Sequence, residues 1–414
     1  MNFHISYTKL PNGVRVLCIP MASVESVTAL VLVKTGSRNE TEEQAGISHV
    51  LEHMVFKGTK SYPTPMAIAE AVDGIGAEQN AFTNKEYTGY YITSAAKHLP
   101  LSLKILSEMV TVPLLPQEDL NREREVIVQE INMYEDQPMD MAAEEWEKLM
   151  YQGSTMGREV IGTKETVRAT TSESLRAYLN KWYVGGNVLV VVVGKLPASS
   201  FELLEQLKVN FGGIAKSEIA PYVSPVQYGP VENKHVVKKT EQAHFWMGVP
   251  AFGMMDPRRY ALNLATVILG GGMSSRLFNE VREKRGLSYY VGATLGTDFD
   301  GGYIGVRAGV NPDKLTEAMA VVKAEMLKLP TTMTQEELDK AKEYILGHLP
   351  LSLEDTMGVA QFVGMRALEA EEIRQPSDVE EGIKAVKLAE VKKVASEFIT
   401  EDKIRSVVVG PKLK

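Results

Sequence analysis

Residues 47–58 read ISHVLEHMVFKG, and within this stretch His49 and His53 stand four positions apart. Residues four apart lie on one face of a helix, so two imidazoles at this spacing can bind a single metal ion. Glu52 lies next to the second histidine, where its carboxylate can act as a base for a water at the metal without being a ligand. Only 7 of the 414 residues are histidines, so chance produces this arrangement in roughly one such chain in a hundred.

The same stretch has the pattern of a helix that buries one face. Apolar residues recur at i, i+3, i+4 and i+7, namely Ile47, Val50, Leu51 and Met54. This stripe predicts a core-facing side and leaves the histidines and the glutamate on a different side. The alternative is a solvated helical face that holds two histidines by chance, but the order His-x-x-Glu-His is typical of a group of zinc proteases.

A catalytic zinc ion needs a third protein ligand and one open position. The charged segment 117–134 predicts a helix, on which Glu123 and Glu130 lie seven positions, or two turns, apart and point the same way. One carboxylate could bind the metal while the other supports a histidine or the substrate. The alternative is an ordinary surface helix with salt bridges, and spacing alone does not decide between the two.

The stretch HVLEHMVFKGT at 49–59 resembles the zinc helix of the inverted-motif metallopeptidases, also called inverzincins, the family of pitrilysin, insulin-degrading enzyme and mitochondrial processing peptidase. Other stretches resemble that family too: LPNGVRVL at 10–17, GSR at 36–38 and GAEQNAFT at 76–83. The resemblance covers most of the chain and is greatest to the short members, which are similar to the processing peptidase and form a single shell.

This resemblance implies a role for each of several residues. Glu130, which lies 77 positions after His53, corresponds to the third zinc ligand, and Glu123 to an acidic residue that orients the site. Glu52 corresponds to the general base that acts on the zinc-bound water, with one Zn²⁺ per chain. The substrate is expected to lie extended along a strand that contains Asn80, Ala81, Phe82 and Thr83.

In the second half of the chain, Arg282 and Tyr289 stand seven positions apart around Gly286. The resemblance implies that this pair binds the substrate carbonyl and the oxyanion, for which a guanidinium and a phenol are good donors. The alternative is a surface arginine at a helix end followed by a buried strand tyrosine.

Long members of the family hold both halves of the site in one chain, which closes as a clamshell around the peptide. This chain has about half that length and corresponds to one shell of the clamshell. We therefore expect a homodimer that shares these residues between subunits, or else a heterodimer with a zinc-less paralogue.

Predicted strands and helices alternate along both halves of the chain, and residues 101–124 resemble residues 315–342. We expect an α+β fold of two structurally related α/β domains, each an antiparallel-rich sheet packed with helices, which together form one half of a clamshell. The expected division is an N-terminal zinc-binding catalytic domain at 1–212, a linker at 213–231 and a C-terminal domain at 232–414 without a zinc site. The alignment of the halves places the zinc helix opposite residues 274–278.

The formal net charge of −8 argues against a nucleic-acid partner. The first residues show no signal peptide, and no apolar run approaches the length of a membrane span. These features predict a cytoplasmic bacterial or archaeal protein, or a protein of an organellar matrix if a transit peptide has been removed.

Taken together, these features predict a zinc-dependent endopeptidase that hydrolyses unfolded peptides or presequence-like segments inside a closed dimeric chamber. Two alternatives remain: a non-catalytic structural or partner subunit of the same family, and a hydrolase that uses the same zinc on another bond. The sequence does not specify the biological substrate or the cleavage-site preference.

Overall fold

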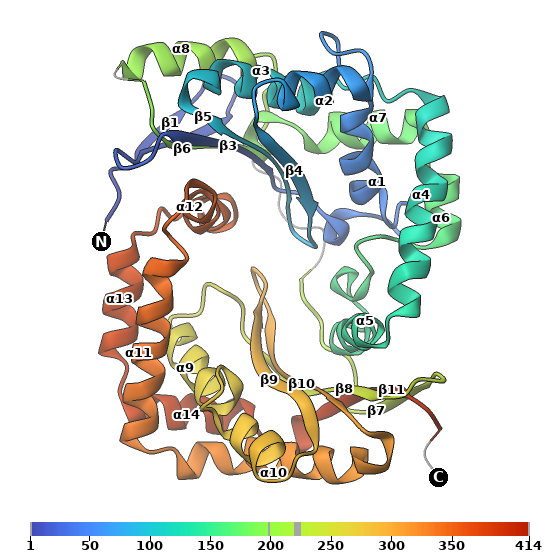
Figure 1. The fold of residues 1–414 in the computed structure, drawn as a ribbon, viewed down its shortest axis with the longest axis vertical. Helices are drawn as coiled ribbons and strands as arrows, with labels where there is room; N and C mark the ends of the chain where they lie inside the picture. The colour runs from blue at the N-terminus through green and yellow to red at the C-terminus, as the bar shows by residue number, and fades with distance from the viewer. Residues whose placement is uncertain (1, 198, 219–224, 413–414) are drawn as a thin grey trace. The chain divides into compact units, whose positions relative to one another are not determined.

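The computed structural model describes residues 2–197, 199–218 and 225–412 and divides into two compact units, each built around one sheet (Figure 1). Unit 1 comprises Met1–Ile131, Arg158–Ser224 and Leu349–Pro376, and unit 2 comprises Asn132–Gly157, Pro225–His348 and Ser377–Lys414. The predicted α+β class, with two domains of mixed sheets packed with helices, is confirmed. Residues 219–224 of the predicted linker lie outside the described residues.

The sheet of unit 1 has six strands in the order β1-β2-β6-β3-β5-β4. In chain order these are Ser6–Lys9, Arg15–Pro20, Ser26–Val33, Glu78–Thr83, Thr88–Ala95 and Val188–Gly194. The pair β2 and β6 is parallel, and the other neighbours are antiparallel. Central strands β3 and β6 are buried on both faces, which explains why they read as continuous apolar runs rather than as alternating patterns.

The sheet of unit 2 has five strands in the order β7-β11-β8-β10-β9. In chain order these are Asn233–Val237, Ala243–Ala251, Ser288–Thr297, Gly302–Val310 and Arg405–Gly410. Matching β2 through β6 with β7 through β11 in chain order gives the same strand order in both sheets, including the parallel pair. The topology is therefore duplicated, as the similarity between the halves predicted.

The duplication corrects one expectation from the sequence. Helices α1 (Ile47–Met54) and α2 (Pro65–Asp73) lie between β3 and β4, while α9 (Arg259–Gly270) and then a short π-helix (Phe278–Glu283) lie between β8 and β9. The counterpart of α1, the helix with the two histidines, is therefore α9, and the pairing with residues 274–278 was wrong. Helix α9 contains no His, Cys, Asp or Glu, so it offers no ligand set.

Helices cover both faces of each sheet. In unit 1, α3 (Leu99–Thr111) lies on one face together with α8 (Ser200–Phe211), while α12 (Thr356–Ala370) packs on β3 and β6 (Figure 1). In unit 2, α10 (Leu315–Thr332) and α14 (Leu388–Phe398) pack with α9, while α5 (Pro138–Met150) packs on β8 and β11. The remaining helices are α4 (Gln117–Asp136), α6 (Lys164–Ala169), α7 (Ser172–Trp182), α11 (Gln335–Leu351) and α13 (Pro376–Ala385).

Each half of the chain contributes a helix to the sheet of the other half. Helix α5 follows α4 and belongs to unit 2, whereas α12 follows α11 and belongs to unit 1. The division expected at residues 213–231 was based on the sequence alone. Each compact unit also includes a segment from the other half of the chain, with α5 in unit 2 and α12 in unit 1. The segment of α4 up to Ile131 stays in unit 1, and this segment carries the acidic residues of the candidate site.

Sequence reasoning missed α12, which contains two glycines and lacks a clear one-sided apolar stripe. A glycine inside a helix costs about 1 kcal/mol relative to alanine, so this composition argues against a helix. The fold requires the glycine nonetheless, because a Cβ atom on Gly364 would lie 2.9 Å from a methyl group of Val191 and 3.0 Å from one of Leu32. The helix therefore lies directly on the sheet, a tertiary contact that no local pattern reveals.

No helix among the described residues is both long enough and apolar enough to cross a membrane.

Candidate metal centre

Helix α1 presents two different sides, as its sequence pattern predicted. Val50, Leu51 and Met54 are fully buried in unit 1. His49, Glu52 and His53 lie on another side and are partly exposed. The apolar stripe thus fixes the helix against the core, and it leaves the two imidazoles facing α4 and the Glu52 carboxylate facing β4.

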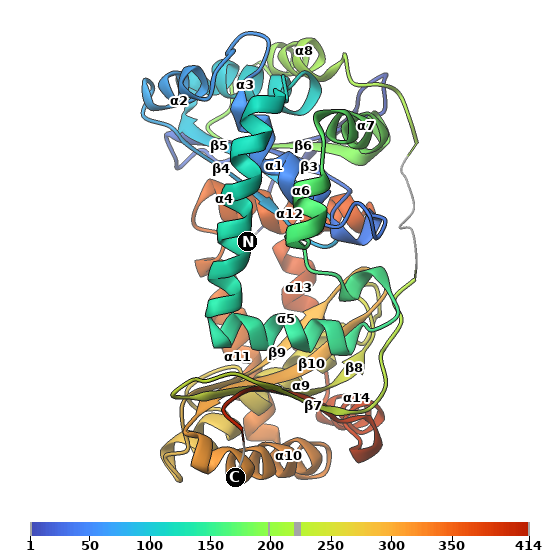
Figure 2. The same cartoon turned by 90° about the vertical axis from the view of Figure 1, so that its right-hand side faces the viewer.

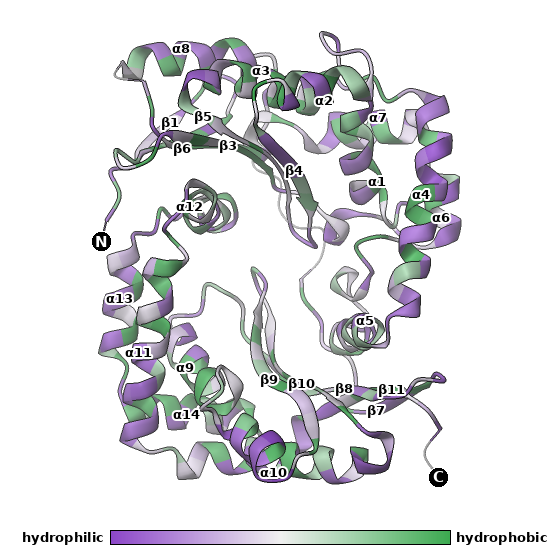
Figure 3. Cartoon of the chain, viewed as in Figure 1, coloured by the Kyte–Doolittle hydropathy of each residue, from purple (hydrophilic) through white to green (hydrophobic). Residues whose placement is uncertain are grey.

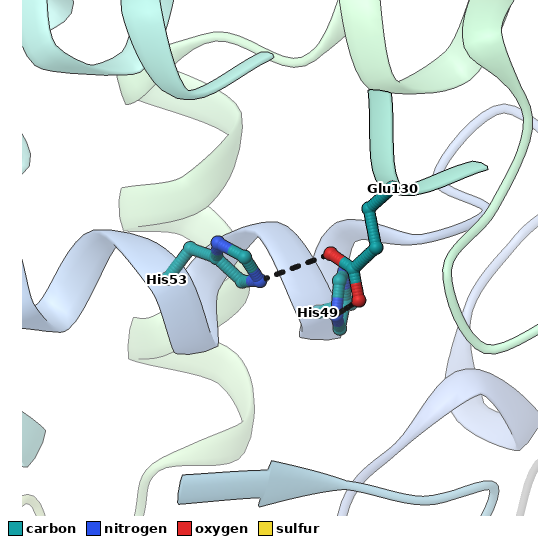
Figure 4. A group of neighbouring side chains, drawn as sticks. All are labelled: His49, His53 and Glu130. Carbon is teal, nitrogen blue, oxygen red and sulfur yellow. Dashed lines mark ion pairs between the residues drawn. The ribbon is translucent and has the colours of Figure 1, made fainter. Parts of the chain in front are cut away.

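His49, His53 and Glu130 converge, although the glutamate comes from α4 and the histidines from α1 (Figure 4). The Nε2 atom of His49 lies 3.9 Å from one carboxylate oxygen of Glu130, and Nε2 of His53 lies 3.6 Å from the other. One ligand atom from each residue can be chosen so that all three lie within 4.8 Å of one another. Helix α4 runs beside α1 in both views of the fold (Figures 1 and 2).

This arrangement fits a zinc ion. Ligand atoms at about 2.0–2.2 Å from a tetrahedral zinc lie about 3.3–3.6 Å apart, and the two imidazoles lie 3.9 and 3.6 Å from the Glu130 carboxylate. Burial, together with the neighbouring His53, lowers the pKa of His49 to about 3, so this imidazole is neutral and its lone pair is available to a metal. Two imidazoles and one carboxylate are a donor set that zinc accepts in catalytic sites, where water or substrate takes the fourth position.

Glu123 supports the site without facing the same point as Glu130. Its Oε1 atom lies 3.0 Å from Nδ1 of His53, and its Oε2 atom lies 2.6 Å from the ammonium of Lys57. Burial acts to raise the pKa of Glu123, but hydrogen bonds from His53 and Lys57 hold that pKa below its usual value. An ionised carboxylate on Nδ1 fixes the ring orientation and directs Nε2 toward the metal position.

Glu52 lies beside this group with its carboxylate held by the edge strand. The hydroxyl of Thr83 on β4 donates a 2.5 Å hydrogen bond to Oε2 of Glu52. Burial raises the pKa of Glu52, and Glu130 adds to this effect, while Thr83 and His53 act in the opposite direction. A raised pKa moves a carboxyl group toward the neutral range in which a general base is most effective.

Strand β4 carries the four residues that were expected to bind substrate, Asn80, Ala81, Phe82 and Thr83. Among the described residues, β4 pairs only with β5, so its other edge is open to a further strand. Thr83 also contacts the catalytic candidate Glu52, so this edge runs directly to the site.

Arg282 and Tyr289 belong to unit 2, whereas the metal candidates belong to unit 1. The guanidinium carbon of Arg282 lies 5.3 Å from the centre of the Tyr289 ring, so the two side chains form a cation–π pair. Tyr289 is 78% exposed, which argues against the alternative of a buried strand tyrosine. An exposed phenol beside a guanidinium is available to a ligand.

Two contacts of the site were not anticipated from the sequence. Lys57 pairs with Glu123, and a signal for it existed, because Lys57 follows His53 by four positions on the continuing helix. Thr83 was expected to contact the substrate and in addition binds Glu52. No local signal predicted that contact, because 31 residues separate the two partners.

The similarity to known proteins agrees with this site. Residues 15–164 match the family described as Insulinase (Peptidase family M16), and residues 169–345 match the Peptidase M16 inactive domain. The metal candidates all lie within the first match, and Arg282 and Tyr289 lie within the second.

The chain belongs to peptidase family M16, as its close relatives also show. A protein of Streptomyces coelicolor named as an uncharacterized zinc protease is 34% identical over 414 residues, which span 98% of this chain and 89% of that protein. A Bacillus subtilis protein with the same description is 34% identical over 393 residues, spanning 94% of this chain and 95% of that protein.

Solved structures share the fold along the whole chain. A structure described as a peptidase M16 inactive domain from Pseudomonas fluorescens has a TM-score of 0.92 at 20% identity and covers 99% of this chain and 98% of its own. A protease from Helicobacter pylori has a TM-score of 0.90 at 23% identity and covers 99% and 100%. At these identities the similarity shows the fold alone.

Proposed function

We propose that this protein is a zinc-dependent endopeptidase that hydrolyses unfolded peptides or presequence-like segments. The observation that carries the proposal is the convergence of His49, His53 and Glu130 on one point. Glu52 lies beside this group, and its carboxylate binds Thr83 and is not one of the three candidate ligands. A metal-binding set with an adjacent base is the arrangement that metal-assisted hydrolysis requires. The names of the relatives as zinc proteases support the same conclusion.

His49, His53 and Glu130 would hold the zinc ion, and Glu123 would keep the imidazole of His53 in its ligand orientation. When bound, zinc supplies a Lewis acid that polarises the scissile carbonyl and lowers the pKa of the attacking water. Glu52 then accepts the proton of that water and passes it to the departing amine. The hydrogen bond from Thr83 leaves one oxygen of Glu52 free for this proton transfer.

The open edge of β4 is the proposed position of the substrate. An extended peptide could add to this edge as a further strand, with backbone hydrogen bonds that do not depend on the peptide's sequence. Such binding favours an unfolded substrate, because most backbone groups of a folded protein are already paired. Since Thr83 lies on β4, a peptide on this strand would approach Glu52.

Arg282 and Tyr289 would provide donors to the oxyanion from the second subunit of a homodimer, in which each subunit would complete the chamber of the other. Retention of the full ligand set and of this Arg/Tyr pair in one chain favours two equivalent subunits over a heterodimer with a zinc-less paralogue. The same retention argues against the alternative of a non-catalytic structural subunit.

The direct test of the proposal is a metal-dependent peptidase assay. The purified protein is expected to cleave a quenched fluorescent peptide library, to lose this activity after treatment with a chelator, and to regain it with about one equivalent of Zn²⁺ per chain. Zinc binding without any peptide cleavage would instead support the structural-subunit alternative. The absence of stoichiometric zinc binding would contradict the proposed metal site.

Sharing of the site between subunits is tested by mixing two inactive variants. Glu52→Gln and Tyr289→Phe are each expected to be impaired alone, the latter by about 10²–10³-fold as for the loss of one oxyanion donor. Random re-association gives half heterodimers, each with one complete site, so about a quarter of wild-type activity should return. A mixture that stays inactive, although sedimentation shows subunit exchange, would contradict the shared site.

A further inference from the structure

The two histidines of the candidate site are supported in different ways. The ring of His53 is oriented by Glu123, which binds its Nδ1 atom. The Nδ1 atom of His49 is buried and has no hydrogen-bond partner among the described residues. No hydrogen bond to Nδ1 therefore fixes the His49 ring, whose place depends on the helix that carries it and on contact with the His53 ring, centred 4.6 Å away.

The residue before His49 is held at two of its atoms. Ser48 is fully buried, and its backbone N–H donates a 2.8 Å hydrogen bond to Oε1 of Glu40. Its hydroxyl lies 2.8 Å from the hydroxyl of Tyr178. That phenol also lies 2.7 Å from the hydroxyl of Thr35, so Tyr178 is itself fixed.

Glu40 replaces the capping side chain that α1 lacks. Gly46 occupies the N-cap position and has no side chain to accept from the first turn. The backbone N–H of Gly46 donates a 2.7 Å hydrogen bond to Oε2 of Glu40, so one carboxylate satisfies two N–H groups at the start of the helix. A carboxylate at this end is also favoured by the helix dipole.

The loop around Glu40 cannot easily rearrange. Glu40 is 1% exposed, and the guanidinium of Arg158 donates to its backbone carbonyl. A Cβ atom on Gly46 would lie 2.5 Å from the carbonyl oxygen of Ile161, and one on Gly162 would lie 2.4 Å from that of Ala45. Both glycines also have positive φ angles, so the two loops pack backbone against backbone at the start of α1.

We infer that Glu40 and Tyr178 are positioning residues that fix Ser48 and, through it, the ligand atom of His49. This inference deepens the proposed function and rests on it. Neither residue would touch the metal or the substrate. Their expected effect is on the affinity and the geometry of the metal site, because a ligand without its own hydrogen-bond partner follows its backbone.

The variants Glu40→Gln and Tyr178→Phe test this role, with Zn²⁺ affinity measured by competition with a chromophoric chelator. Partners that orient ligands typically contribute about 10–100-fold to metal affinity, and we expect about 10-fold weaker binding for each variant. The visible absorption spectrum of the Co²⁺-substituted protein is expected to change as well, since it reports ligand geometry. Glu123→Gln serves as the positive control, because Glu123 binds a ligand directly.

Matched controls separate positioning from general stability. Glu108 also satisfies a backbone N–H and two hydroxyl groups, at Thr59 and Ser61 rather than on α1. The phenol of Tyr228 bridges two backbone groups in unit 2, as the phenol of Tyr178 bridges two hydroxyls in unit 1. Glu108→Gln and Tyr228→Phe are expected to keep wild-type zinc affinity and the wild-type Co²⁺ spectrum, whatever happens to Tm.

Wild-type zinc affinity and an unchanged Co²⁺ spectrum in both test variants, with only a lower Tm, would overturn the inference. Equal weakening in the matched controls would overturn it too. If Glu40→Gln does not fold, the volume-conserving Tyr178→Phe decides alone. Failure of the wild-type protein to bind zinc would overturn the proposed function along with the inference, whereas normal wild-type binding confines any failure to the inference.

Discussion

Replacement of Glu52 by glutamine is expected to reduce peptide hydrolysis by about 10²–10⁴-fold, the range in which general acid–base catalysis contributes. Glutamine has the same shape, and its carbonyl oxygen can still accept the hydrogen bond of Thr83. It cannot accept a proton from water, so turnover is lost while the ligands remain. Zinc content measured by elemental analysis should stay at one ion per chain.

The same substitution is not expected to lower Tm in the metal-free protein. Burial raises the pKa of Glu52, so the folded protein binds this proton more tightly than the unfolded chain does. Such a group favours folding at low pH, and this contribution is lost as the pH rises toward the folded-state pKa. Removing the charge thus removes an unfavourable contribution at neutral pH.

Glu70→Gln is the matched control for this experiment, because Glu70 is an exposed glutamate on α2 in the same unit. It is expected to retain full activity. An active Glu52→Gln protein, shown by mass spectrometry to be free of wild-type enzyme, would end the assignment of Glu52 as the base.

Replacement of Glu130 by glutamine is expected to weaken zinc binding by well over about 100-fold, the upper end for residues that only support a ligand. The amide keeps the shape but loses the negative charge that a divalent cation requires. The Glu130 side chain is partly exposed, so the metal-free variant should fold with wild-type Tm. Affinity is measured by chelator competition, and peptidase activity should fall with metal occupancy.

Glu125→Gln is the matched control, because Glu125 lies on the same helix and, within the described part of the chain, its side chain forms an exposed ion pair with Arg168. It is expected to leave zinc affinity unchanged. Wild-type zinc affinity in Glu130→Gln would show that the third ligand lies elsewhere, and the convergence with His49 and His53 would then have no metal-binding role.

The two acidic residues of α4 show where sequence reasoning reaches its limit. Seven positions place Glu123 and Glu130 on the same side of the helix, and α4 is predominantly hydrophilic along its length, like many surface helices (Figure 3). Spacing could not say which carboxylate faces both histidines, and only the resemblance to a family suggested Glu130. The packing of α4 on α1 separates them, because Glu130 meets both Nε2 atoms while Glu123 meets Nδ1 of His53 and Lys57.

The Arg282 and Tyr289 pair shows a similar limit. The local sequence favoured a surface arginine and a buried strand tyrosine, and only the resemblance to a family suggested a functional pair. Exposure of the phenol and its contact with the guanidinium are properties of the folded unit. Whether Arg282 and Tyr289 would contact substrate at the site of their own subunit or of a second subunit depends on how a dimer assembles. The mixing experiment addresses that question.

The sequence by itself determined the helix that carries His49 and His53, its buried stripe and the placement of a carboxylate beside two imidazoles, because these features depend on residues within one or two helical turns. It also determined the α+β class, because stretches with the residue pattern of strands alternate with stretches that have the pattern of helices. The tertiary structure decided which distant glutamate meets the histidines, which hydroxyl holds Glu52, and that α12 covers the first sheet. Those choices depend on packing between segments tens to hundreds of residues apart, whose free energy comes from buried surface and backbone approach rather than from any local pattern.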